Sequence, residues 1–305
     1  MNQQNHGDHI ATPLQTRTAL LKRAVRNATP IRRAFVQAPK GTEESGSQEG
    51  PLADFVRRGD RRGLLTYLFA LALTSSSNDD GWTTTRDGLV WARALGMTTT
   101  TNTNTAARAA AWKAFGRLHD SGLLRRARGE KKSQIKVTLL HEDGSGREYT
   151  RPGKEEGRYF QLPHRFWTEK YFDDLDLPAI AMLLVLLTGR GKQKLPQEKM
   201  PAWYGWSADT AARGLKQLRE IGLIEVDSFT RPEPLAPKGW TSVNEYRLDP
   251  AFRSLTGSHK GEEVSTDHGE QRERTAEEDQ ADDLAVADGG ADDLHDRPGR
   301  DVADA

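Results

Sequence analysis

The sequence predicts an α+β, mainly helical chain with two tandem domains of one kind between a basic N-terminal arm and an acidic C-terminal tail. One pattern of helix cap, apolar stripe and glycine occurs twice, one hundred residues apart. Charge is also divided, because residues 256–305 hold 16 Asp/Glu against 5 Lys/Arg in a chain with 44 of each. The remaining residues therefore carry a balance of +11. A length of 305 residues is itself typical of about two domains.

The clearer copy of the pattern lies at residues 207–224. Ser207 can cap the free N–H groups of a first helical turn. Gly222 suits the residue that turns the chain out of a helix. Between them an apolar stripe recurs at helical spacing: Ala211, Leu215, Leu218 and Leu223. We therefore expect a helix here, followed directly by a short strand.

The second copy of the pattern lies upstream. Its members Ala111, Lys113, Phe115, Leu118, Gly122, Leu123 and Leu124 match Ala211, Arg213, Leu215, Leu218, Gly222, Leu223 and Ile224. Its helix cap is expected in the polar run at 98–105. Repetition at this distance indicates two copies of a domain of roughly 90 residues, because a solenoid repeats every ~20–50 residues.

The elements around each copy predict two winged helix-turn-helix domains, at 51–152 and 153–255. In the first domain we expect helices at 61–74, 86–95 and 104–121, a short strand at 82–85, and a hairpin of strands 123–128 and 134–140 with a basic turn. In the second we expect an extended segment at 159–162, helices at 178–189, 197–204 and from 207, and strands at 224–229 and 241–248 around a Pro-rich loop.

The two ends of the chain are expected to be disordered. Residues 1–50 form the basic arm, in which a loosely periodic stretch at 16–36 is only a weak helix signal. His6 and His9 make a pair without a third ligand nearby, so a metal site is not expected. Residues 256–305 are charged and poor in aromatic residues, and repeat the tetrapeptide ADDL. This tail is predicted to solubilise the chain, and the alternatives are a docking motif or an electrostatic competitor for the DNA-binding face.

The helix of the second domain resembles the recognition helix of GntR-type winged-helix repressors. The residues that follow its spacing are Ser207, Thr210, Ala211, Gly214, Leu215, Leu218, Gly222, Leu223 and Ile224. Gly214 stands where those repressors usually carry Ala, and Ala208 where they usually carry Arg. The upstream helix has Arg108 where those repressors carry Arg. The resemblance covers about 18 of 305 residues and includes no GntR-type effector domain. It implies a winged helix that binds DNA.

Composition and motifs argue against an enzyme. The chain has no Cys, which excludes disulfides, zinc–thiolate sites and thiol catalysis. No Gly-rich phosphate loop or nucleophile elbow is present, so neither catalysis nor a cofactor is expected. No apolar run approaches the roughly 20 residues that span a bilayer, so we expect a cytoplasmic protein without membrane contact.

The outward faces of the two helices and the tips of the two wings instead predict binding to double-stranded DNA. A helix in the major groove needs short polar and long basic side chains, and wing lysines reach phosphates. The expected DNA-binding residues are Thr105, Arg108, Lys113, Lys131 and Lys132 in the first domain, and Ser207, Thr210, Arg213, Gln217 and Lys238 in the second.

Three roles remain open. A transcriptional regulator is preferred, and a plasmid-type replication initiator is the alternative, because tandem winged helices resemble initiators that grip iterated origin repeats. The third role is a protein–protein module, with a protein partner on the second domain or the acidic tail. Asp209 would be repelled by a phosphate, which favours this role for the second domain, although a carboxylate also suits a first helical turn. The target DNA and the oligomeric state stay open.

Overall fold

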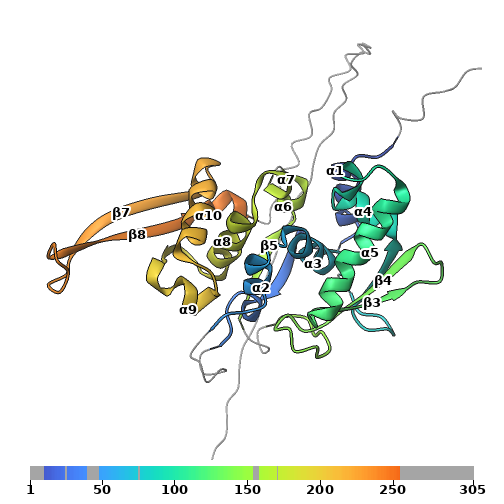
Figure 1. The fold of residues 1–305 in the computed structure, drawn as a ribbon, viewed down its shortest axis with the longest axis horizontal. Helices are drawn as coiled ribbons and strands as arrows, with labels where there is room; N and C mark the ends of the chain where they lie inside the picture. The colour runs from blue at the N-terminus through green and yellow to red at the C-terminus, as the bar shows by residue number, and fades with distance from the viewer. Residues whose placement is uncertain are drawn as a thin grey trace, which may run out of the picture. The chain divides into compact units, whose positions relative to one another are not determined.

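The fold is mixed α/β in the computed structural model, which describes residues 10–24, 26–39, 48–74, 76–153, 158–169 and 171–254. The pair His6 and His9 and the tail 256–305 lie outside these residues. The described elements make two repeats of one arrangement and an N-terminal segment, residues 10–24 and 26–36, that packs on the first repeat, on β5 and on α6 (Figure 1).

The first repeat runs through α3 (Arg61–Leu73), β2 (Thr83–Asp87), α4 (Gly88–Ala94), α5 (Asn104–Asp120), β3 (Leu124–Arg128) and β4 (Gln134–Leu139). Its sheet has the order β2-β4-β3, with both pairs antiparallel. Alternate residues of β4, among them Ile135 and Val137, are buried against the helices. The short turn η3 (Met97–Thr99) joins α4 to the cap of α5.

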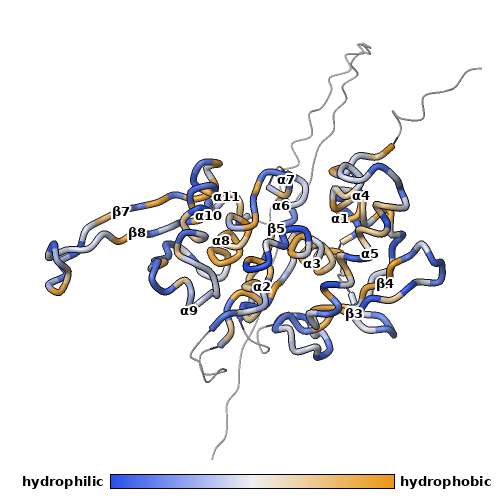
Figure 2. The backbone as a smooth tube through the Cα atoms, viewed as in Figure 1, coloured by the Kyte–Doolittle hydropathy of each residue, from blue (hydrophilic) through white to orange (hydrophobic). Residues whose placement is uncertain are grey.

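The second repeat has the same order of elements: α8 (Leu177–Thr188), β6 (Lys192–Lys194), α9 (Met200–Tyr204), α10 (Ala208–Glu220), β7 (Ile224–Pro232) and β8 (Trp240–Leu248). Its sheet order is β6-β8-β7, so the last strand is again the central one. Helix α8 is apolar along nearly its whole length (Figure 2) and is buried from Ala179 to Leu187. The short turn η4 (Gln197–Lys199) precedes α9, and α11 (Pro250–Arg253) follows β8.

The predicted helix ends are confirmed in both repeats. Ser207 caps α10 and Thr103, from the polar run, caps α5. Gly122 and Gly222 adopt positive φ values of 71° and 73°, the left-handed conformation that glycine tolerates best. The pattern predicted these ends because capping depends on neighbouring residues only.

The expectation of a disordered arm is wrong for residues 12–24 and 26–36. This part forms α1 (Pro13–Leu21), β1 (Ala28–Arg32) and the turn η2 (Arg33–Phe35). Strand β1 pairs antiparallel with β5 (Tyr159–Pro163), Ile31 opposite Phe160. The apolar residues of this N-terminal segment are only loosely periodic because they belong in turn to a helix, a strand and a 3-10 turn. Leu21, Ile31 and Phe35, one from each, are all buried.

Three short helices pack with the N-terminal segment and the two repeats. They are α2 (Leu52–Arg57), α6 (Arg165–Thr168) and α7 (Tyr171–Asp174). Helix α1 packs against α4 and α6, and α2 packs against α3 and α8. The buried side chain of Arg17 donates to the carbonyl oxygens of Ala94 (3.2 Å) and Trp167 (3.0 Å). Phe69 continues this junction, with ring centroids 6.1 Å from Trp91 and 5.0 Å from Trp167.

Candidate functional site

Helix α5 presents a polar face because its apolar face is buried. Thr103 accepts a hydrogen bond from the backbone N–H of Ala106 (3.1 Å) and starts the helix. Ala111, Phe115 and Leu118 pack into the core. Thr105 in the first turn and Lys113 near the middle are exposed.

Arg108 is half-buried and held in place. Its Nε lies 3.4 Å from Oδ1 of Asp87, the residue that caps α4. Burial by itself raises the pKa of the Asp87 carboxyl, but hydrogen bonds from Ser133 and the Leu89 N–H, together with Arg108, outweigh it and lower that pKa. Asp87 is thus ionised at neutral pH and orients Arg108 at the start of α5.

The β3–β4 hairpin carries the basic turn that the sequence predicted. Lys131 and Lys132 are exposed at this turn. Arg128 donates to the Lys132 carbonyl oxygen (2.9 Å), which fixes the turn relative to the strand.

The hairpin is joined to α5 by a stack that sequence reasoning missed. The guanidinium groups of Arg126 and Arg128 lie 3.9 Å and 3.7 Å from the ring centroid of Trp112. Arg126 also donates to the Trp112 carbonyl oxygen (2.7 Å). Two residues apart on a strand share one face, so both arginines point at the helix. That spacing beside a helical Trp was the available signal.

The surface of α5 and its hairpin is strongly basic. Residues 104–139 contain nine Lys/Arg and two Asp/Glu, a net charge of +7. Four of the nine contact a carboxylate: Arg108 with Asp87, Arg117 with Asp60, Arg125 with Glu148 and Lys136 with Asp80. In the described part of the chain the other five have no carboxylate partner: Lys113, Arg126, Arg128, Lys131 and Lys132.

Helix α10 of the second repeat is different, because its polar side chains are engaged within the chain. Ser207 Oγ accepts from the Thr210 N–H (3.2 Å) and lies 3.0 Å from the Thr210 hydroxyl. Arg213 pairs with Asp209 (3.2 Å), one helical turn before it. Residues 208–248 contain six Lys/Arg and six Asp/Glu, a net charge of zero.

Gln217 does not present a free amide for a groove contact. Its Nε2 donates to the Asp174 carbonyl oxygen and its Oε1 accepts from the Asp176 N–H, both at 3.0 Å. The structure therefore places Gln217 against the turn that leads into α8. This pairing joins residues more than 40 positions apart, so helical spacing could not indicate it.

The second hairpin is longer than predicted and largely exposed. Strands β7 and β8 have nine residues each, which is about 30 Å of strand. Lys238 lies in its loop, 5.6 Å from the ring centroid of Trp240. Three large apolar side chains are exposed along it: Phe229 (41%), Leu235 (94%) and Trp240 (45%).

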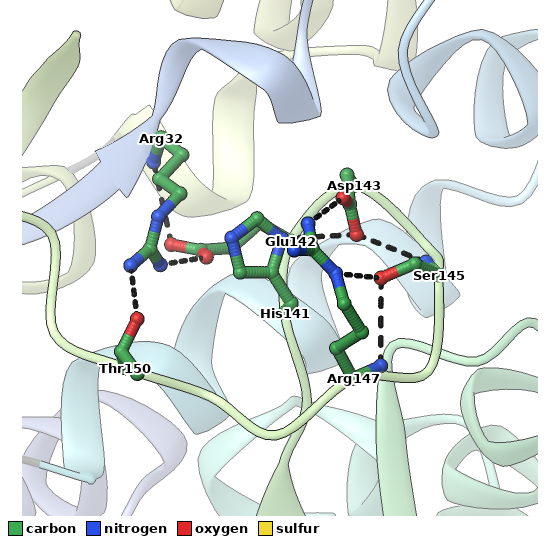
Figure 3. Close-up of polar contacts among 7 residues, drawn as sticks. All are labelled: Arg32, His141, Glu142, Asp143, Ser145, Arg147 and Thr150. Carbon is green, nitrogen blue, oxygen red and sulfur yellow. Dashed lines mark hydrogen bonds and ion pairs between the residues drawn. The ribbon is translucent and has the colours of Figure 1, made fainter. Parts of the chain in front are cut away.

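A polar cluster joins the N-terminal strand to the end of the first repeat (Figure 3). The buried guanidinium of Arg32 pairs with the buried carboxylate of Glu142 and donates to the Thr150 hydroxyl (2.7 Å). Beside it Asp143 accepts from Arg147 (2.6 Å). Burial raises the pKa of Glu142, and Arg32 opposes that shift.

This cluster is a structural joint. It borders a cleft of about 1390 Å³ in which Arg32, Arg147 and Lys194 are each paired with a carboxylate, Lys194 with Glu245 at 3.5 Å. Arg33, which donates to the Gln37 side chain (2.8 Å), and Arg158 also line this cleft. Among the described residues, no group of three or more His, Asp or Glu is placed to hold a metal ion.

No protein-family model matches the chain, and no curated protein matches it. In the described part of the chain, none of the helices is both long and apolar enough to cross a membrane.

Proposed function

We propose that the protein binds double-stranded DNA as a tandem winged helix-turn-helix protein, chiefly through α5 and the β3–β4 hairpin of the first repeat. The order helix, strand, two helices, two strands supports the winged-helix interpretation in both repeats, as do the sheet orders β2-β4-β3 and β6-β8-β7. In this interpretation α5 enters the major groove and the hairpin is the wing.

The observation that carries the proposal is the group of five cations without a carboxylate partner on α5 and its hairpin. DNA presents one negative charge about every 1.7 Å along the helix axis, so a protein gains affinity by placing cations that release its counterions. A cation already paired with a carboxylate contributes less, because the carboxylate repels the phosphate.

Within this surface the residues divide by chemistry. Thr105 and Arg108 are at the start of α5, the end of a recognition helix that contacts base edges, and an arginine can donate two hydrogen bonds to guanine. Asp87 presents Arg108 in one orientation. Lys113, Lys131 and Lys132 are exposed point charges that suit phosphates.

A transcriptional regulator is the role we prefer, with a plasmid-type replication initiator as the alternative. Both use the same surface, so the position of the bound DNA distinguishes them. Sites close to the protein's own promoter favour the regulator, and iterated sites within an origin favour the initiator. Footprinting of the full chain on its own genomic region is the measurement.

For the second repeat a specific observation favours contact with a protein. Residues 208–248 have no net charge, and Arg213 and Gln217 are engaged within the chain. Phe229, Leu235 and Trp240 expose apolar surface on the hairpin instead. Exposed apolar surface is typical of protein interfaces, and a surface whose positive and negative charges cancel gives little attraction to phosphates.

The test is fluorescence anisotropy of the full chain on labelled duplex DNA across a salt series. We expect a steep loss of affinity with salt, and a log–log slope that flattens by about 0.9 for each phosphate contact removed, here by Lys131→Ala and by Lys132→Ala. Lys238→Ala, at the tip of the other hairpin, is the matched control and should leave the slope unchanged. Absence of binding at low salt would overturn the DNA function.

A further inference from the structure

A second group of arginines lies where the N-terminal segment crosses the first repeat. After α1 ends, Arg23 reaches a cleft of about 630 Å³ that is also lined by Arg86 of β2 and by Lys136 of β4. Arg128 lines the same cleft, next to the turn that carries Lys131 and Lys132. The cleft therefore begins at the basic hairpin and continues toward the N-terminal segment.

Arg23 and Arg86 line the cleft, and in the described part of the chain neither is paired with a carboxylate. Arg86 donates to the neighbouring Thr85 carbonyl oxygen (2.7 Å), and within the described residues its buried Nε has no hydrogen-bond partner. Burial, together with the like charge of Arg23, lowers the pKa of Arg86. Asp80 is already paired with Lys136 (2.8 Å), and Glu130 is exposed on the hairpin turn.

The arrangement is repeated a few residues further along the chain. Arg26 and Arg151 line a pocket of only about 20 Å³, which shares Ala24 and Thr74 with the first cleft. Burial, followed by the charge of Arg26, lowers the pKa of Arg151. Over the part of the chain that the structure describes, the buried Nε of Arg151 also lacks a hydrogen-bond partner.

Repulsion within each pair, Arg23 with Arg86 and Arg26 with Arg151, lowers the stability of the folded state unless an anion binds to the pair. The C-terminal dipole of α1 accounts for a cation at Arg23, but its effect is confined to the last helical turn and does not reach Arg26 or Arg151. A phosphate fits the larger cleft between Arg23 and Arg86, and a second phosphate of the same backbone can contact the exposed Arg26 at the surface of the small pocket. Guanidinium groups donate several hydrogen bonds to phosphate oxygens in a fixed, forked geometry.

We propose that Arg23, Arg86, Arg26 and Arg151 form a phosphate-binding track for the nucleic-acid backbone, continuous with the β3–β4 hairpin. The inference rests on the proposed function and extends it. The N-terminal segment thereby has two roles: Arg17 holds it to the folded body, and Arg23 and Arg26 lengthen the DNA contact beyond the wing.

The test compares Arg23→Gln and Arg26→Gln with Lys22→Gln, an exposed control in the same segment that does not line the cleft. Both arginines are exposed, so the variants should fold. In the salt series on duplex DNA, each arginine variant should lower the slope by about 0.9 and the control should not. In the absence of DNA, the two arginine variants should also melt at a higher temperature than the wild type, because each removes the repulsion between one pair of arginines.

Each other outcome has a defined meaning. Wild-type slopes for both arginine variants, alongside a lowered slope for Lys131→Ala, would overturn the track and leave the proposed function standing. Loss of all DNA binding in the unmodified chain would overturn both. If pyrophosphate raises the melting temperature of the wild type but not of an Arg23→Gln, Arg26→Gln double variant, and DNA slopes stay at wild type, the site takes a small phosphate compound and the nucleic-acid assignment fails.

Discussion

Replacing Arg17 with Ala should destabilise the protein strongly, although Arg17 lies in a segment that the sequence marked as an arm. The side chain is 1% exposed and stacks 3.9 Å from the ring centroid of Phe172. It donates to the carbonyl oxygens of Trp167 and Ala94 and to Asp173 (2.8 Å). The substitution leaves two carbonyls at the junction without their donor.

The expected loss follows from these contacts. Hydrogen bonds from a charged group contribute about 1.5–3 kcal/mol each, and Arg17 donates two of them to backbone carbonyl oxygens. Asp173 is 61% exposed and stays hydrated, so its contribution is small. We therefore expect the free energy of unfolding to fall by about 3–5 kcal/mol, or a melting temperature lower by roughly 10 °C.

Urea and thermal unfolding of the full chain measure this effect. The control is Arg58→Ala, because Arg58 is 71% exposed and only 4.0 Å from Asp54, and a surface pair of this kind is worth about 1 kcal/mol at most. If Arg17→Ala is no more destabilising than Arg58→Ala, Arg17 does not hold α4 of the first repeat to α6 and α7, and its assignment is refuted.

Three further predictions test the site and the core. Gln217→Ala should lower the free energy of unfolding by about 1–2 kcal/mol, because two backbone groups lose their hydrogen-bond partner. The slope of DNA affinity against salt should stay unchanged, and a flattened slope would show that Gln217 contacts DNA. Trp112→Ala should weaken DNA binding without removing any charge, because Arg126 and Arg128 lose the ring that holds the hairpin against α5; circular dichroism that stays at wild type excludes unfolding as the cause. Burial lowers the pKa of His164 to about 4, so the folded state resists protonation and stability should be lost as the pH falls from about 6.5 to 4. His164→Gln should flatten the pH dependence of urea unfolding in that range, and an unchanged pH profile would refute the assignment.

The sequence by itself predicted the parts of the fold that depend on neighbouring residues. The caps Thr103 and Ser207, the left-handed glycines and the apolar stripes of α5 and α10 are local patterns, and the structure confirms them. The basic turn at Lys131 and Lys132 was also visible, because a hairpin brings together residues that are close in sequence. A charge on such a turn is exposed wherever the hairpin packs.

The tertiary structure alone decided what distant residues do together. Strand β1 was unpredictable because its partner β5 lies more than a hundred residues away, and a short strand acquires its hydrogen bonds only when that partner is present. From the sequence, Gln217 and Arg213 have the same position on one polar helix face. In the structure Gln217 binds a turn 41 residues upstream, whereas Arg213 binds a carboxylate four residues away. The sequence also did not predict that Arg23 and Arg86 line one cleft or that Arg126 stacks on Trp112. The partners of a side chain depend on the folded structure and cannot be inferred from its charge alone.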